Sequence, residues 1–330
     1  MGRRVFVIIG MLLLIFDSRS ALQGAQEGID LCLRVVIPSI FPMMFLSRFL
    51  TSQQWNGPKW LCRLFYLPKK SQSFLIAGIF SGYPVGAQLV ANAHKTNRLR
   101  DADARRMICI CSNCGPAFLF GMTAQLFDQL WISWALWGIL LLSSLLTSWI
   151  IPGKPGEYHC ISTDKTNNSE NQIKSVKAMG IICGWVILFR VILKLWNHWT
   201  AGRLPMLCQI AIGGILELSN GCSSLIGISN PGVKFVFSGL FMSFGGMCVL
   251  LQILGMSQNV DMSAYFPGKI FQSAFCVLVT YFVQLLSFTS ADKFTLPLWS
   301  IGIFMLIMLL SAYFLRKSKN TSRILKKVVV

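Results

Sequence analysis

The stretch FLIAGIFSGYPVGAQLVAN (74–92) places Ser81, Gly82, Pro84 and Gly86 in the middle of an otherwise apolar segment. As a continuous helix, this segment would be roughly 28 Å long, close to the thickness of a bilayer core. Proline has no amide hydrogen and glycine has no side chain, so the centre of the segment is expected to end a helix and free backbone polar groups. Lipid offers these groups no hydrogen-bonding partner. We therefore expect a broken membrane helix that faces a site inside the protein.

Similar apolar stretches fill most of the chain. It has 330 residues, of which 54% are hydrophobic and only 13% charged, and its mean hydropathy is +0.60. Soluble proteins average about 25% charged residues, so a water-soluble enzyme is excluded. The apolar stretches are 5–16, 31–50, 74–92, 107–127, 131–151, 178–196, 204–228, 235–257, 270–288 and 296–315. Their charged side chains are Arg34, Arg48, Arg190, Lys194 and Glu217. This pattern predicts an all-α polytopic membrane protein with about eight to ten transmembrane helices.

Further clusters of helix-breaking residues interrupt the apolar stretches on both sides of a polar segment, 152–177. They are PSIFP (38–42), NCGP (113–116), ELSNG (217–221) and SFGG (243–246). Breaks in both parts of the chain indicate two similar halves with broken helices. The predicted divisions are a signal anchor or signal peptide (1–27), a first transmembrane half (28–151), a polar cytoplasmic linker (152–177), a second transmembrane half (178–315) and a basic cytoplasmic tail (316–330).

The distribution of basic residues bears on how the stretches cross the membrane. If all ten stretches span, the basic loop residues divide almost evenly between the two sides. If 74–92 and 235–257 are instead re-entrant hairpins that turn back at their glycines, all basic loop residues except Arg19, Arg203 and Lys293 lie on one side. The positive-inside rule favours this second arrangement, with both termini in the cytoplasm.

Composition also suggests two functions that the residue pattern does not support. The net charge of +18 could indicate nucleic-acid binding, but the basic residues lie in loops beside apolar spans, and we expect no nucleic-acid partner. Cys109, Cys111 and Cys114 form a CxCxxC motif, but the three histidines lie outside the apolar stretches. A zinc site requires further ligands at set spacing, so we expect packing cysteines and no bound metal or cofactor.

Glu217 is the one carboxylate inside an apolar stretch. A charged group there costs about 2.5–3.5 kcal/mol on insertion scales, so it needs a partner or a function. One interpretation is a site for a substrate or for a coupling proton or Na⁺. The other is a structural ion pair with Arg34, Arg48, Arg190 or Lys194. The sequence leaves both open.

Five ordered segments resemble a known family. They are GIDLCLRVVIPSIFPMMFLS (28–47), FSGYPVGAQLVANAHKTNRL (80–99), ICSNCGPAFLFG (110–121), GILELSNG (214–221) and SFGGMCVLLQ (243–252). In this order they resemble the sporulation integral membrane protein YlbJ family. That family carries the Gate, or nucleoside-recognition, domain and is similar to concentrative nucleoside transporters. The resemblance implies a membrane transporter of spore-forming bacteria, in a family implicated in moving dipicolinate into the spore.

The resemblance and the polar breaks together give a predicted substrate site. Its residues are Ser81, Gly82, Tyr83, Pro84, Gly86, Gln88, Asn113, Gly115, Pro116, Ser219, Asn220, Gly221, Gly245, Gly246 and Gln252, with Glu217 for the coupling ion or proton. Ser112 and Cys114 depart from the Asn and Ser more usual in the family, which weakens a polar-ligand role there. The resemblance also implies repeats of inverted topology, which conflicts with two hairpins that both enter from the cytoplasm.

These observations predict an integral protein of the cell membrane, or of the membrane around the forespore, that is not an enzyme. It is expected to move a small anionic solute such as dipicolinate, or a nucleoside-like solute. Its expected partners are the lipid bilayer, that solute and, in an oligomer, further copies of itself. The alternative is a non-transporting membrane scaffold or assembly factor for the spore cortex. A scaffold should tolerate the loss of Glu217 and Gly82, whereas a carrier should not.

Overall fold

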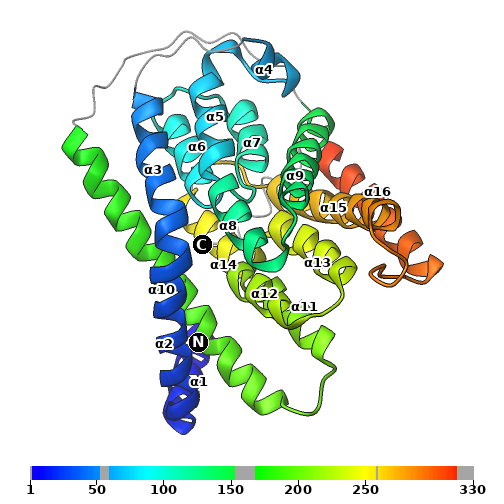
Figure 1. Ribbon diagram of the computed structural model, residues 1–330. Helices are drawn as coiled ribbons and strands as arrows, with labels where there is room; N and C mark the ends of the chain where they lie inside the picture. The colour runs from blue at the N-terminus through cyan, green and yellow to red at the C-terminus, as the bar shows by residue number, and fades with distance from the viewer. Residues whose placement is uncertain (1, 53–58, 153–167, 258, 318–330) are drawn as a thin grey trace.

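The computed structural model describes residues 2–52, 59–152, 168–257 and 259–317, and the regular elements within these ranges are all helical (Figure 1). In the first part of the chain the helices are α1 (Gly2–Phe16), α2 (Ser18–Leu31), a π-helical turn (Cys32–Val36), α3 (Ile37–Ser52), α4 (Lys59–Leu64), α5 (Gln72–Ser81), α6 (Val85–Lys95), α7 (Asp101–Ile110), α8 (Pro116–Leu126) and α9 (Leu130–Ile150). In the second part they are α10 (Asn168–Thr200), α11 (Met206–Leu216), α12 (Leu218–Ser224), α13 (Pro231–Phe244), α14 (Gly246–Met256), α15 (Tyr265–Ser287) and α16 (Leu298–Lys317).

The prediction of an all-helical polytopic membrane protein is confirmed. Six helical segments of the described chain are long and apolar enough to cross a bilayer: Ser18–Thr51, Leu130–Ile150, Ser175–Thr200, Pro231–Met256, Tyr265–Ser287 and Leu298–Lys317. This number is lower than the predicted eight to ten, because the breaks divide other apolar stretches into helices of 7 to 11 residues. A helix of ten residues is about 15 Å long and reaches half-way through a bilayer core.

The same order of elements occurs twice along the chain. Apart from α4 and the single turns, in each part a long helix is followed by two shorter helices packed side by side, then by two shorter helices that do not pack along each other, and then by a long helix. The first series is α3, α5 with α6, α7 with α8, and α9; the second is α10, α11 with α12, α13 with α14, and α15. The chain therefore reverses direction between α5 and α6 and between α11 and α12.

The two reversals start from opposite ends of the bundle (Figure 1). At one end, called here the α4 end, the Arg106 guanidinium donates to the carbonyls of Tyr66 and Ile151 at 2.9 and 2.8 Å, and Arg105 lies 3.5 Å from Asp261. At the other, the α11 end, the Lys234 ammonium donates to the Leu126 carbonyl at 3.4 Å. The α5–α6 pair enters the bundle from the α4 end, and the α11–α12 pair enters it from the α11 end.

The prediction that 235–257 folds back on itself at Gly245–Gly246 is wrong. Within this stretch α13 and α14 do not pack side by side, and Pro231–Met256 is long enough to form one kinked span. The reversal in the second part lies in 204–228, at Glu217. A glycine pair allows a kink or a reversal equally well, so packing against neighbouring helices decides between them. Lys234 consequently lies at the α11 end, although the charge count placed it with the other basic loops.

The expected break at PSIFP (38–42) is also absent. Instead α2, the π-helical turn and α3 continue as one long helix, with Pro42 inside α3. A π-helical turn shifts the backbone hydrogen-bonding register just before the prolines. The Ser39 hydroxyl donates to the Val35 carbonyl at 2.6 Å and lies 3.2 Å from the Val36 carbonyl. Hydroxyl side chains and π-helical turns are among the local adjustments that allow a membrane helix to continue through proline.

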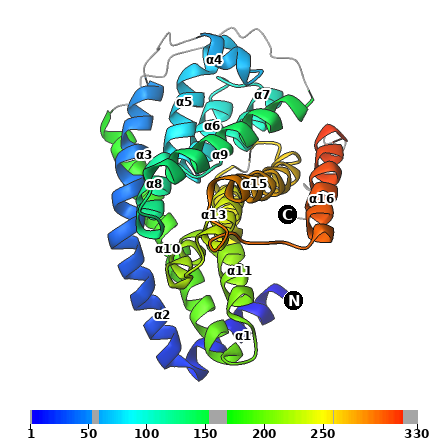
Figure 2. The same ribbon diagram turned by 45° about the vertical axis from the view of Figure 1, so that its right-hand side comes forward.

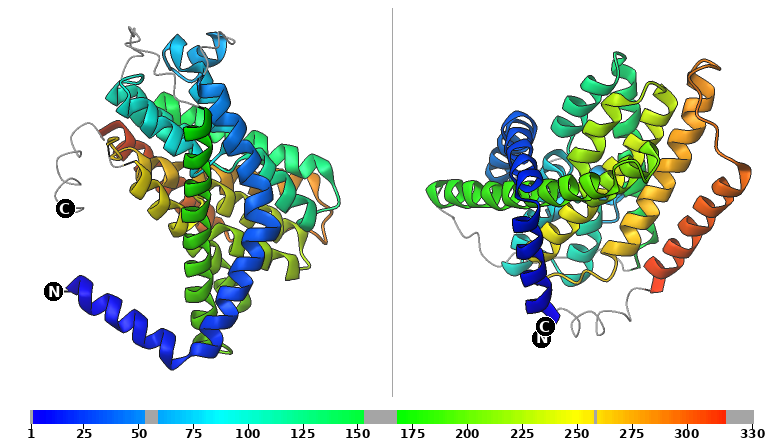
Figure 3. Two further views of the ribbon diagram at one scale, coloured as in Figure 1. Left: turned by 90° about the vertical axis from the view of Figure 1, so that its left-hand side faces the viewer. Right: turned by 90° about the horizontal axis from the view of Figure 1, so that it is seen from below.

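Two long helices form one face of the molecule. Figure 3 (left) shows α10 beside α2–α3 along this face, and α1 leaving α2 at an angle. Because α10 begins at Asn168, the last ten residues of the predicted polar linker are helical rather than irregular. Residues 153–167 of that linker and 318–330 of the predicted basic tail lie outside the described residues. At the far edge α16 packs beside α15 (Figure 2).

Candidate functional site

The tip of the α5–α6 pair lies directly on the break between α7 and α8. Gly82 has φ of +64°, in the left-handed region that glycine adopts without strain. A Cβ built on it would lie 2.6 Å from the Gly115 Cα and closer still to the Gly115 nitrogen. The next residue, Tyr83, donates its backbone N–H to the Asn113 carbonyl at 2.8 Å. Glycine is therefore needed here because two backbones touch.

The α7–α8 break holds a buried lysine that comes from α15. The Lys269 ammonium donates to Asn113 Oδ1 at 2.6 Å and to the Ser243 carbonyl at 3.2 Å, and it lies 5.8 Å from the centre of the Tyr83 ring. Only 3% of Lys269 is exposed, and no carboxylate of the described residues lies within 4 Å of it. A lysine side chain thus lies inside the bundle with no ion-pair partner among the described residues.

Sequence reasoning missed Lys269 because it lies one residue before the apolar stretch 270–288, where a lysine normally belongs to a loop. The sequence does contain one indication of a buried lysine. Lys269 is the one charged residue in the segment YFPGKIFQSAF (265–275).

The kink between α13 and α14 connects the first break to the second reversal. Gly245, with φ of +83°, faces the Tyr83 ring, and the Tyr83 hydroxyl donates to the Met242 carbonyl at 3.3 Å. A Cβ on Gly246 would lie 3.1 Å from the Leu218 nitrogen, at the start of α12. The α5–α6 tip, the α7–α8 break, the α11–α12 turn and the α13–α14 kink therefore meet at one place.

Glu217 forms the α11–α12 turn and is 2% exposed. Its carboxylate accepts the backbone N–H groups of Ser219 and Asn220 at 2.9 and 2.7 Å, so it caps the start of α12. The sequence also allowed a structural ion pair between Glu217 and one of the four cations in the apolar stretches, but no such pair occurs among the described residues. Those four cations have other partners: Arg34 pairs with Asp30, Arg48 donates to Gln88, and Arg190 and Lys194 pair with Glu27.

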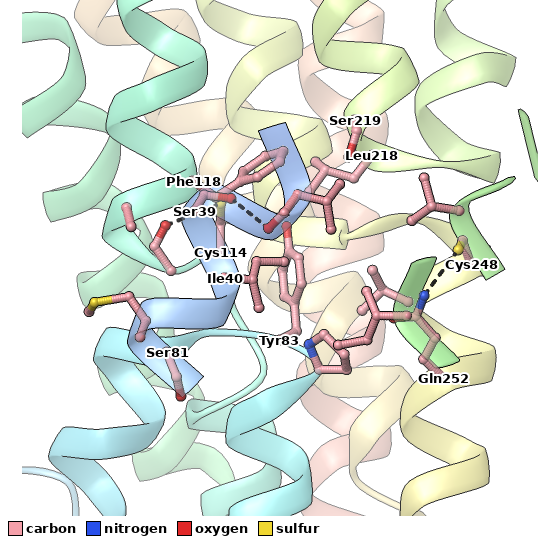
Figure 4. A pocket seen from close by; sticks show the side chains of 18 of the residues that line it. Ser39, Ile40, Ser81, Tyr83, Cys114, Phe118, Leu218, Ser219, Cys248 and Gln252 are labelled. Carbon is pink, nitrogen blue, oxygen red and sulfur yellow. Dashed lines mark hydrogen bonds between the residues drawn. The ribbon is translucent and has the colours of Figure 1, made fainter. Parts of the chain in front are cut away.

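A small cavity opens beside the meeting point of the four breaks (Figure 4). Its volume is about 30 Å³, room for about two water molecules and far less than a small-molecule site needs. The predicted site residues that line it are Ser81, Tyr83, Pro84, Gly115, Glu217, Ser219 and Gln252. Helices α3, α8, α10 and α14 supply most of the remaining wall, which includes Ser39, Cys114 and Phe118. The conformation is therefore closed around this space, called here the central cavity.

The other predicted site residues lie outside the lining of the central cavity. They are Gly82, Gly86, Gln88, Asn113, Pro116, Asn220, Gly221, Gly245 and Gly246. Most of the glycines among them serve close packing: Gly86 lies against Cys111, and Gly221 against Gly214. The Gln88 side chain accepts a hydrogen bond from Arg48 at 2.7 Å. These residues shape the walls, and a role in binding stays a prediction.

The cysteines of the CxCxxC motif point to different surroundings. Cys111 packs on Gly78, Cys109 lies near Gly268, and Cys114 lines the central cavity. Within the described part of the chain no group of three or more His, Cys, Asp or Glu side chains could hold a metal ion.

Comparison with known proteins gives one informative similarity. The chain is 22% identical to the "Sporulation integral membrane protein YlbJ" of Bacillus subtilis (strain 168), in an alignment that covers 82% of this chain and 79% of that protein. No family model matches the chain, and no solved structure matches it. The chain is thus an integral membrane protein with a distant homologue among the sporulation proteins.

Proposed function

We propose that this protein is a membrane carrier, rather than an enzyme, for a small anionic solute that binds where the four breaks meet. The observation that carries the proposal is the convergence of these breaks on Lys269 and Glu217, two ionisable groups buried inside a helical membrane protein. Broken helices with buried ionisable groups at mid-membrane are characteristic of secondary transporters. The repeated order of elements and the opposite entry of the two reversals are typical of the same class.

The chemistry of the site favours an anion. Lys269 provides a positive charge behind the Tyr83 ring, and Ser81 and Gln252 provide neutral polar groups at the cavity wall. Together these groups would replace the hydration of a carboxylate. The homologue's name connects the chain to sporulation, and dipicolinate, a pyridine dicarboxylate, is the solute that the YlbJ resemblance implies. A nucleoside-like solute is the second candidate, through the Gate-domain resemblance.

The closed central cavity requires movement during transport. The space is too small for either solute, so the α5–α6 and α11–α12 pairs must shift relative to α3 and α10 to admit it. Each pair is a short reversal that enters half of the membrane from its own side. Movement of one pair at a time would give alternating access.

Glu217 is proposed to couple transport to a proton or Na⁺. Glu217 lines the central cavity, and its carboxylate would repel an anionic solute while ionised. Binding of a proton or cation would remove this repulsion, so the two would travel together. The Glu217 carboxylate caps the start of α12. A change in its charge would therefore act directly on the α11–α12 turn, which is proposed to move.

The basic side chains indicate the orientation of the carrier. At the α4 end, they belong to α4, the turn at Lys69–Ser71, the end of α6, the α6–α7 connection and α7, and include Lys59, Arg63, Lys69, Lys70, Lys95, Arg98, Arg100 and Arg105. At the α11 end, basic residues outside the apolar stretches include Arg19, Arg203, Lys234 and Lys293, and the side chains of Arg190 and Lys194 lie near the same end. The positive-inside rule places the α4 end in the cytoplasm. A reporter fused after Arg100 is therefore expected to report the cytoplasm.

Uptake into vesicles that contain only the purified protein tests the proposal. Labelled dipicolinate and a labelled nucleoside are offered at increasing concentration, with protein-free vesicles as the control. Saturable flux of dipicolinate is expected. Absence of saturable flux for both solutes in vesicles with correctly folded protein would favour the scaffold alternative and end the carrier hypothesis.

A further inference from the structure

A polar cleft lies apart from the central cavity, at the α11 end between α2, α10 and the α11–α12 pair. Its volume is about 600 Å³, within the usual range for small-molecule sites. Its polar lining residues include Gln23, Glu27, Arg190, Lys194, Asn197 and Asn220. A ligand of the size of a small organic acid would fit it without rearrangement.

One wall of the cleft carries an excess positive charge. Glu27 Oε1 lies 2.5 Å from the Lys194 ammonium, and Glu27 Oε2 lies 2.8 Å from an Arg190 Nη2. Each of the three side chains is 28–30% exposed. Neither cation has a second acidic partner within 4 Å among the residues that the structure describes. Two cations therefore share one carboxylate, and hydrogen-bond donors remain on both.

The positions of these charges are fixed by the packing of α2 on α10. A Cβ on Gly24 would lie 2.9 Å from the Val191 Cα, and one on Gly28 would lie 2.9 Å from the Ile187 Cα. The two helices thus touch through their backbones on either side of Glu27. This packing fixes the backbone positions of Glu27, Arg190 and Lys194 at the edge of the cleft.

The opposite wall contains a buried amide that has no partner among the described residues. Asn220 is 3% exposed, it lines the cleft, and neither its Oδ1 nor its Nδ2 has a hydrogen-bond partner within the described chain. A buried polar group without a partner is costly. The backbone N–H of Asn220 donates to Glu217 Oε2 at 2.7 Å, and Glu217 lines the central cavity. Asn220 therefore stands between the cleft and the cavity.

We propose that this cleft is a second binding site, specific for a small carboxylate anion, where the solute is held by Arg190, Lys194 and Asn220 before it passes the α11–α12 turn. The assignment of this anion as the transported solute rests on the proposed function. The Arg190 guanidinium fork and the Lys194 ammonium match a carboxylate, and Glu27 competes for both. The Asn220 amide is buried behind the opposite wall in this conformation, and a shift of the α11–α12 turn would let it bind an oxygen at the other end of the ligand, which favours a dicarboxylate.

Two substitutions with opposite expected effects test this site. Lys194→Gln removes a donor to the anion and should weaken binding about tenfold. Glu27→Gln removes the competing carboxylate and should tighten binding about tenfold. The matched control is Lys177→Gln, which removes an exposed lysine from the same helix, far from the cleft, and should leave binding unchanged.

Binding is measured on purified full-length protein in detergent, by the increase of melting temperature with dipicolinate and with its uncharged diamide. Dipicolinate should stabilise the protein and the diamide should not. If Glu27, Arg190 and Lys194 serve only to hold α2 against α10, Lys194→Gln and Glu27→Gln should both lower the melting temperature without ligand. Both variants should then leave the affinity for dipicolinate unchanged. That result would overturn the proposal. Stronger stabilisation by phosphatidylglycerol than by dipicolinate would assign the cleft to a lipid headgroup and would also overturn it.

Vesicle uptake separates this inference from the proposed function. Dipicolinate binding with the expected response of both variants, but without flux, would keep the cleft site and reject the carrier. Flux with an unchanged half-saturation concentration in both variants would keep the carrier and reject the cleft site.

Discussion

Replacing Lys269 with methionine separates a structural from a functional role for the buried lysine. The substitution keeps the length of the side chain and removes its charge. It deletes hydrogen bonds to Asn113 Oδ1 and to the Ser243 carbonyl, worth about 3–6 kcal/mol together because the donor is charged. It also removes the cost of burying an ammonium group without an ion-pair partner, which is several kcal/mol. The two effects nearly cancel, so the free energy of unfolding should change by no more than about 2 kcal/mol.

Anion affinity, in contrast, should fall clearly. The Lys269 ammonium lies 5.8 Å from the Tyr83 ring centre, and the ring lines the central cavity. A carboxylate on the cavity side of the ring would lie roughly 9 Å from the ammonium, an attraction of about 1.8 kcal/mol at an effective dielectric constant of 20. Its loss should weaken binding to this site about 20-fold for each negative charge.

The assay compares dipicolinate uptake by vesicles with wild-type, Lys269→Met and Lys95→Met proteins. Lys95→Met removes an exposed lysine of α6 and serves as the control for net charge. Lys269→Gln, which retains a hydrogen-bond donor without the charge, is the second variant if Lys269→Met folds poorly. An unchanged half-saturation concentration in a stable Lys269 variant would refute the electrostatic argument.

Three further outcomes are expected. Gly82→Ala should destabilise the fold by about 2–5 kcal/mol, because its Cβ would collide with Gly115 at a left-handed backbone position, whereas Gly121→Ala, with open space around it, should be neutral in thermal unfolding. Glu217→Gln keeps one of the two capping contacts, so the free energy of unfolding should fall by about 1 kcal/mol. The variant should still exchange solute but should lose accumulation driven by a pH or Na⁺ gradient. Normal accumulation would contradict the coupling role. Burial raises the pKa of Asp103 despite the nearby arginine charge, so the folded state binds the proton more tightly than the unfolded chain and stability should rise as the pH falls through the interval between the two pKa values. Asp103→Asn should remove this dependence, which melting temperatures measured in steps from about pH 7 down to about pH 4 would reveal.

Local chemistry was enough to locate most of the breaks. Proline, glycine and polar residues inside apolar stretches marked the positions near Gly82, Asn113, Glu217 and Gly245, and each does interrupt a helix. At 38–42 the same signal failed, because a π-helical turn and the Ser39 hydroxyl keep the helix intact around its prolines.

What a break does to the chain direction depends on long-range packing. Gly82 rests on Gly115, and Gly246 rests on the α11–α12 turn, so each conformation is decided by residues distant in sequence. The role of Lys269 could not be predicted from the sequence for the same reason. A single lysine next to an apolar stretch is typical of a loop, and only the folded chain brings it to Asn113, 156 positions earlier.

The exchange of contacts between the two halves also constrains how the protein is made. The side-chain oxygen of Asn113 and the hydroxyl of Tyr83 find their partners on Lys269 and Met242, which the ribosome adds much later. At about 5–20 residues per second, the 156 positions between Asn113 and Lys269 take roughly 8–30 s to synthesise. During that interval the first half waits in the membrane with polar groups unsatisfied, and it depends on water, lipid headgroups or insertion machinery to shield them. A chain whose synthesis stops before α13 would keep this polar surface permanently and become a substrate for membrane quality control.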